Sequence, residues 1–171
     1  AALMCALEIE REQNKALGEW PFEIGLWVGS AATPNRMGRA NDSSPGAANS
    51  AYSKLTKFHN NAARYASPIP LEECPWCGTP FVTDSFQLDP PGSRNPDNLL
   101  VACNNMRCDF SAARNARLPI VGVDEPIYRR LPCFLIATVD KFAALPWTGR
   151  SGALFGRVER YDEQKGFFGP C

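Results

Sequence analysis

CFLIATV, at residues 133–139, decides the fold class, because its apolar run is almost continuous. Runs of this kind are typical of strands in parallel sheets whose two faces are both covered. The strand leads into a helix that we expect over residues 141–145, with Asp140 as its cap and Pro146 at its end. A buried strand that continues directly into a helix predicts an α/β fold.

Two further strands are expected on the amino-terminal side of this run. Residues 118–123 form a short apolar run, and Asp124-Glu125-Pro126 then supplies the carboxylates and the proline that favour the start of a short helix. FEIGLWVG, at residues 22–29, alternates apolar residues with others and ends at a glycine, as strands do. These strands would share one sheet with residues 133–139.

The first 65 residues also contain the expected helices and a loop between them. Residues 1–17 are rich in Ala, Leu and Glu and precede Gly18, which favours a helix end. Residues 47–65 carry apolar residues at helical spacing, which predicts a helix of about four to five turns. The Gly-, Ser- and Pro-rich residues 30–46 predict a mobile surface loop. Because the sequence opens inside a helix-like stretch without a Met, we expect a segment of a longer protein.

Two close cysteine pairs stand out, one in CPWCG at residues 74–78 and one in CNNMRC at residues 103–108. A tight turn within each pair directs both thiolates toward one ion, and a glycine beyond the second cysteine lets the backbone bend. Four thiolates fill a tetrahedral site and leave no position for a reactive water. We therefore predict one structural Zn²⁺ bound by Cys74, Cys77, Cys103 and Cys108.

The residues between the pairs predict a hairpin, with residues 81–83 as one arm, residues 99–102 as the other and a proline-rich tip at residues 89–92. This layout is that of a zinc ribbon. The rival interpretations are a redox CxxC motif, which needs only one pair, and two disulfides, which need an oxidising compartment. Cys133 is expected to be buried in its strand and Cys5 to pack on its helix; Cys171 allows no prediction.

Charge and motif content exclude several classes of function. Eighteen basic residues balance eighteen acidic ones, so overall charge gives no argument for a nucleic-acid or membrane partner. No apolar run approaches the roughly 20 residues that cross a bilayer, and the first residues lack the basic, apolar and small-residue order of a signal peptide, so we expect a cytoplasmic protein. His59 is the single histidine, which argues against a catalytic triad. Neither GxxxxGK[ST] nor GxGxxG occurs, so no nucleotide site is predicted within the chain.

The wording of several segments resembles the large helicase-like subunit of DISARM antiphage systems: LPCFLIATVDKFAALPW at 131–147, GALFGRV at 152–158, IGLWVG at 24–29 and TPN at 33–35. That family is similar to superfamily 2 helicases. Their first RecA-like lobe carries a phosphate loop, then DNA-contacting motifs, then an acidic DExH-type motif. The resemblance implies that this chain is the middle of that lobe, with ATP and Mg²⁺ bound only in the parent protein. Alone, the chain should not hydrolyse ATP.

The resemblance also places ATVDK, at residues 137–141, at the strand-to-helix turn that touches the nucleic-acid backbone in superfamily 2 enzymes. Hydroxyls, amides and a lysine at such a turn can meet a phosphate without reading bases. The implied contact residues are Ser30, Thr33, Asn35, Thr138 and Lys141. The alternatives remain open: Asp140 as a plain helix cap, Lys141 as a solvated side chain, and residues 29–35 as a flexible surface loop.

The predicted architecture is thus an α/β fold with a partial RecA-like parallel sheet and an inserted four-cysteine zinc ribbon. The expected divisions are residues 1–67 as the first part of the lobe, 68–117 as the zinc-ribbon insert and 118–171 as the second part. The predicted function is an internal segment of an ATP-dependent DNA helicase or translocase of antiphage defence, which binds DNA and a partner subunit through the parent protein. The alternative is a zinc-ribbon module for protein interaction without motor function.

Overall fold

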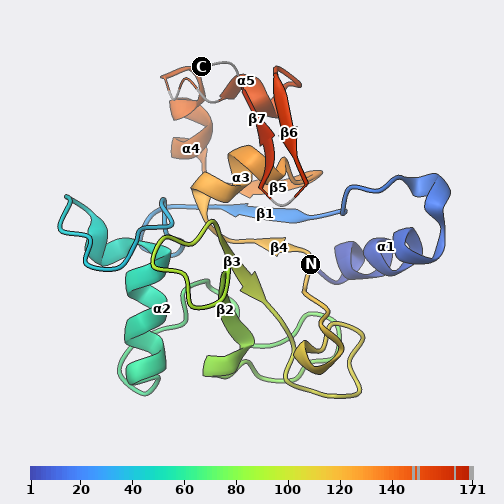
Figure 1. Ribbon diagram of the computed structural model, residues 1–171, viewed down its shortest axis with the longest axis horizontal. Helices are drawn as coiled ribbons and strands as arrows, with labels where there is room; N and C mark the ends of the chain where they lie inside the picture. Colours follow the sequence, from blue (N-terminus) through green and yellow to red (C-terminus); the bar gives the residue numbers. More distant parts are fainter. Residues whose placement is uncertain (148, 150, 164, 170–171) are drawn as a thin grey trace.

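A three-stranded parallel sheet lies at the centre of the chain (Figure 1), for which the computed structural model describes residues 1–147, 149, 151–163 and 165–169. Its order is β4 (Ile120–Val121), β1 (Ile24–Trp27) and β5 (Phe134–Ala137). Both outer strands run parallel to β1. The α/β fold with a parallel sheet is therefore confirmed. Cys171 lies outside the described residues.

The remaining elements surround this sheet. The described helices are α1 (Ala2–Gln13), α2 (Ala51–Asn60), α3 (Asp124–Arg130), α4 (Val139–Ala144) and α5 (Ser151–Leu154). Short 3-10 helices cover Lys15–Leu17, Ala47–Asn49, Thr83–Ser85, Ala112–Arg114 and Leu145–Trp147. Two antiparallel hairpins pair β2 (Phe86–Asp89) with β3 (Asn98–Val101), and β6 (Arg160–Asp162) with β7 (Gly166–Phe168).

The two faces of the central sheet pack against different parts of the chain. Ile24 and Ile120 belong to a core that α1, α2 and the cysteine module share. Trp27 and Val121 point the other way and pack with Ile127 of α3. This division follows from the alternation of side chains along a strand. One hydrophobic core therefore joins the cysteine module to the sheet.

The prediction that both faces of residues 133–139 are covered is wrong. Phe134 and Ile136 are 53% and 46% exposed, because β5 is an edge strand and only its Leu135 face packs on a described core. Cys133, predicted to be buried, is exposed as well. Cys5 is fully buried. The apolar run therefore predicted the strand correctly. It did not predict that, within the described part of the chain, only one face of this strand is covered.

Several predicted boundaries also move. The helix expected over residues 47–65 is shorter, because Ser50 caps α2 by accepting a hydrogen bond from the Ser53 amide and the helix ends at Asn60. Thr138, rather than Asp140, stands at the N-cap position of α4, so Asp140 lies in the first turn. The glycine-rich residues after 149, which showed no periodicity, contain α5 and the β6–β7 hairpin. Elements of three or four residues are too short to display a period.

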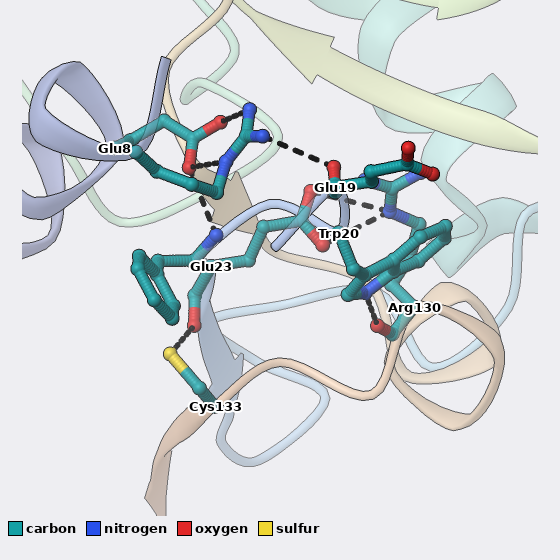
Figure 2. A network of polar contacts seen from close by, with 8 residues as sticks. Glu8, Glu19, Trp20, Glu23, Arg130 and Cys133 are labelled. Atoms are coloured by element: carbon teal, nitrogen blue, oxygen red, sulfur yellow. Dashed lines mark hydrogen bonds and ion pairs between the residues drawn. The ribbon is translucent and has the colours of Figure 1, made fainter. Parts of the chain in front are cut away.

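A polar network ties the amino-terminal edge of the sheet together (Figure 2). Glu23 directly precedes β1, and its carboxylate accepts hydrogen bonds from Arg130 Nε and NH2, the latter at 2.6 Å. Trp20 donates its indole N–H to the Arg130 carbonyl at 2.8 Å, and the Arg130 guanidinium lies 4.7 Å from the centre of the Trp20 ring. Glu8 of α1 accepts the Phe22 amide at 2.9 Å. The network thereby joins α1, β1 and α3.

Gly122 offers a direct test of the packing between the sheet and the cysteine module. A Cβ at this position would lie 2.3 Å from Cγ2 of Ile69, which is fully buried. Gly122→Ala is therefore expected to lower the free energy of unfolding by about 1–3 kcal/mol. Urea denaturation measures the change. Gly29→Ala is the control, since nothing lies within 4 Å of its Cβ position. Equal stability of the two variants would contradict close packing of Gly122 against Ile69.

Candidate metal centre and polar cluster at the sheet edge

The first cysteine pair lies in a tight hairpin-like turn. The Cys74 amide donates to the Thr79 carbonyl, and the Gly78 amide donates to the Cys74 carbonyl, both at 2.8 Å. Gly78 has φ +71°, a conformation that glycine adopts without steric cost. The bend expected beyond the second cysteine is therefore present.

The second pair forms a similar turn. The Cys103 amide donates to the Phe110 carbonyl at 2.8 Å, and the Asn105 amide points at Cys103 Sγ over 3.3 Å. Trp76, in the first turn, donates its indole N–H to the Asp109 carboxylate at 2.8 Å. Side chains of the two turns therefore hold the cysteine pairs against each other.

The four sulfurs converge on one point. All four lie within 4.8 Å of one another, with Cys77 and Cys103 at 3.5 Å and Cys74 and Cys108 at 3.9 Å. A tetrahedron with Zn–S bonds of about 2.3 Å has S···S edges of about 3.8 Å, whereas a disulfide measures about 2.05 Å. The separations fit shared coordination of one ion and not two disulfides.

The ionisation of the thiols also favours a cation. Burial and the neighbouring cysteines raise the pKa of Cys74 and of Cys108. Burial works the same way on Cys77, but hydrogen bonds with Thr79 and the other thiols lower its pKa to about 6. Four adjacent thiolates therefore need a positive ion to coexist. The cluster can hold a metal ion such as Zn²⁺, which the all-sulfur donor set suits.

The hairpin between the pairs differs from the prediction in one arm. The first arm is β2 at Phe86–Asp89 and not residues 81–83. Thr83 instead begins the short 3-10 helix Thr83–Ser85. The Ser85 hydroxyl stabilises this 3-10 helix, because it accepts a hydrogen bond from the Val82 amide at 3.1 Å and donates one to the Asn104 side chain at 2.6 Å. The second arm, β3, lies where it was expected within one residue.

A second group of polar side chains gathers at the carboxyl ends of the parallel strands. Trp27 ends β1, Thr138 follows β5, and Asp124 begins the helix after β4. Lys141 places Nζ 2.5 Å from Asp124 Oδ2 and 3.0 Å from Asn35 Oδ1. Burial raises the pKa of Asp124, and Lys141 opposes that rise. These five residues form the carboxyl-edge cluster.

Within the described part of the chain, three buried atoms of this cluster have no hydrogen-bond partner: Trp27 Nε1, Asp124 Oδ1 and Thr138 Oγ1. Burial raises the pKa of Asp124 and a polar contact with the Trp27 indole partly opposes that rise, so these two groups lie close enough to compensate each other in part, and the Thr138 hydroxyl is the atom left without any partner among the described residues. An unsatisfied buried polar group costs about 1–3 kcal/mol. Ligands of open α/β sheets bind at this carboxyl edge. The cluster therefore has the properties of a binding site.

The sequence-predicted contact residues are distributed unevenly. Lys141 joins two of them, because its ammonium donates to Asn35 Oδ1 and its backbone amide donates to the Thr138 carbonyl, both at 3.0 Å. Thr33 is fully buried and donates its hydroxyl to the Val28 carbonyl at 3.0 Å, whereas Ser30 is exposed. Sequence reasoning missed the roles of Asp124 and Trp27. The sequence does place the Asp124 carboxylate just after a predicted strand. This position predicted the start of a helix, which is correct, but it also indicates a polar site at the carboxyl end of the strand.

The fold and the sulfur cluster define an α/β protein with a four-cysteine module that can hold a metal ion. No family model matches the chain. It is related to the DISARM protein DrmA of Bacillus paralicheniformis, with 33% identity over 165 residues. The match covers 96% of this chain and 14% of that protein, so the chain corresponds to a small part of its relative. Among the described helices, none has the length and apolarity that crossing a membrane requires.

Proposed function

We propose that this chain is an internal segment of the first RecA-like lobe of an ATP-dependent DNA helicase or translocase of DISARM antiphage defence. The segment contributes contacts to the nucleic-acid backbone and a structural zinc ribbon bound by Cys74, Cys77, Cys103 and Cys108. ATP and Mg²⁺ act elsewhere in the parent protein, and partner subunits of the defence complex bind the assembled protein. The relation to DrmA supports this assignment.

The observation that carries the proposal is the carboxyl-edge cluster. Parallel pairing of β1 with β5 brings Trp27 beside Ala137, so that the turns after both strands open at one edge. Open α/β sheets bind their ligands outside the carboxyl ends of the strands, which is this edge. Thr138 contributes a buried hydroxyl without a partner in the described part of the chain, Asn35 an exposed amide, and Lys141 an ammonium group that pairs with Asp124. Such groups suit phosphate oxygens and would supply affinity without base readout.

Thr138→Val tests this contact without a stability penalty. Valine has the same shape and removes a buried hydroxyl that lacks a partner, so the folded chain should remain at least as stable. If the hydroxyl donates to a phosphate, affinity for a DNA oligonucleotide at low salt falls about tenfold. Fluorescence anisotropy measures the change.

Thr56→Val is the matched control, because the Thr56 hydroxyl only donates to the Tyr52 carbonyl within α2, at 2.8 Å. Its DNA affinity should equal that of the unchanged chain. A zinc-loaded chain that shows no salt-sensitive DNA binding at all would instead favour the zinc-ribbon module for protein interaction.

A further inference from the structure

A large groove lies between the loop at residues 36–39, the tip of the β2–β3 hairpin, α3 and the carboxyl-terminal β6–β7 hairpin. Its volume is about 1300 Å³. Small-molecule pockets usually have about 300–1,000 Å³. The groove is separate from the carboxyl-edge cluster, none of whose five residues lines it. Its size suits a segment of a polymer better than a metabolite.

Specific contacts hold the walls of the groove in place. The Ala40 amide donates to the Arg94 carbonyl at 2.8 Å, which fixes the 36–39 loop to the hairpin tip. Arg129 of α3 donates to the Asp97 carbonyl at 2.5 Å and to the Lys165 carbonyl at 3.4 Å. Arg129 therefore joins the tip to the β6–β7 hairpin. The groove is a built feature and not a gap between independent segments.

The lining carries an excess of positive charge, although the whole chain is neutral. The lining contains six basic side chains and three carboxylates. The basic residues are Arg36, Arg39, Arg129, Arg157, Arg160 and Lys165, and the acidic residues are Asp97, Glu125 and Glu159. Asp97 pairs with Arg129 and Lys165, and Glu125 accepts the Met37 amide at 2.7 Å. Among the described residues, no carboxylate lies within ion-pair distance of Arg39, Arg157 or Arg160. Three guanidinium groups therefore remain available to an anion.

Aromatic rings lie among these cations. Phe155 is 78% exposed, although a phenyl ring favours burial. The Arg160 guanidinium lies 4.6 Å from the centre of the Phe168 ring, and both residues line the groove. Arginines that follow a phosphate backbone, combined with rings on which bases stack, are the usual means of binding single strands. A duplex would offer its phosphates but not the faces of its bases.

We propose that this groove binds single-stranded nucleic acid, with Arg39, Arg157 and Arg160 on the phosphates and Phe155 stacked on a base. The inference rests on the proposed function, and it adds a second contact surface with its own residues. The ligand is a single strand of DNA or RNA, whose shared phosphates and base faces match the lining.

The test compares two triple variants of the zinc-loaded chain with equal loss of charge. Arg39→Gln/Arg157→Gln/Arg160→Gln removes the groove cations. Arg64→Gln/Arg107→Gln/Arg114→Gln removes three exposed arginines that do not line the groove. Fluorescence anisotropy with labelled 20-nucleotide dT, 20-nucleotide rU and a duplex gives Kd at several salt concentrations. Zinc content and thermal unfolding confirm that both variants are folded.

The groove variant should bind the single strands at least tenfold more weakly, and the slope of log Kd against log salt should fall by about 2, as expected for three lost contacts. Phe155→Ala should weaken binding about tenfold without changing the slope. The control triple variant should match the unchanged chain. Tighter binding of dT than of rU, or the reverse, identifies the strand.

Equal weakening by the two triple variants would overturn the groove assignment and leave the proposed function intact, since binding would then reflect only overall charge. Preference for the duplex would overturn it as well. If Thr138→Val alone weakens binding, the carboxyl-edge cluster is the site and the groove is not. Absence of any nucleic-acid binding by the unchanged chain would remove the proposed function itself, together with this inference.

Discussion

Cys74→Ser is expected to lower the thermal unfolding temperature of the chain by about 10–20 °C, which corresponds to roughly 5 kcal/mol for a chain of this size. Structural zinc sites contribute about 10–16 kcal/mol of apparent binding energy, and this energy is folding energy. Cys74 is almost completely buried and shares one core with Phe86 and Val101. Loss of the metal therefore loosens the core between the module and the sheet.

The matched control is Cys133→Ser, since Cys133 is an exposed cysteine outside the sulfur cluster. Its unfolding temperature should change by no more than a few degrees. A strong chelator should bring the unchanged chain down to the unfolding temperature of Cys74→Ser and should have no further effect on that variant. If the two serine variants unfold at the same temperature, the metal centre does not support the fold.

Arg130→Leu is expected to lower the free energy of unfolding by about 3–5 kcal/mol at pH 7, because it leaves the buried Glu23 carboxylate without its partner. The two side chains are only 18% and 11% exposed, and the carboxylate accepts bonds from two guanidinium nitrogens. Urea denaturation measures the loss. Arg114→Leu should cost less than about 1 kcal/mol, since Arg114 and its partner Asp109 are both more than half exposed.

The dependence on pH follows from the pKa of Glu23. Burial raises this pKa above its ordinary value, against the hydrogen bonds and charge of Arg130. A carboxyl group with a raised pKa in the folded state destabilises the fold as pH rises from the ordinary pKa through the raised one. Removal of Arg130 raises the pKa further. The stability lost in Arg130→Leu should therefore shrink as pH falls below the further raised pKa that Glu23 has in this variant. The double variant Glu23→Leu/Arg130→Leu should recover most of the lost stability at pH 7.

The features that the sequence predicted well are local in the chain. The two cysteine pairs lie within four and six residues, so their spacing alone indicated a shared ion, and the sulfurs do converge. The apolar runs at residues 24–28 and 133–139 indicated strands, and these strands pair in parallel. Both signals depend only on neighbouring residues. The meeting of the two cysteine pairs and the parallel pairing of the two strands still depend on the complete fold, because each joins segments that are distant in the sequence.

The features that the sequence did not predict depend on distant residues. Glu23 and Arg130 are separated by 107 positions, and nothing in either neighbourhood marks them as partners. Lys141 and Asp124 meet only because α3 and α4 begin at the same edge of the sheet. The groove needs the β2–β3 tip and the β6–β7 hairpin on either side of Arg129. Such contacts follow from the complete fold and not from a motif.

The division into residues 1–67, 68–117 and 118–171 stays a prediction. Cys74, Cys103 and Cys108 lie in the same hydrophobic cluster as Ile24 of the sheet and Met4 of α1. The cysteine cluster and the sheet therefore depend on one continuous core. This continuity explains why a change at the sulfurs should affect the unfolding of the whole chain.

X-ray absorption at the zinc edge tests the central claim, one metal ion held by four sulfurs, most directly. The chain purified without added metal should contain one zinc per molecule, with a first shell of four sulfurs at about 2.3 Å. Cys77→Ser should replace one sulfur of this shell or release the metal. A shell of nitrogen and oxygen atoms in the unchanged chain, or a zinc content far below one, would contradict the account.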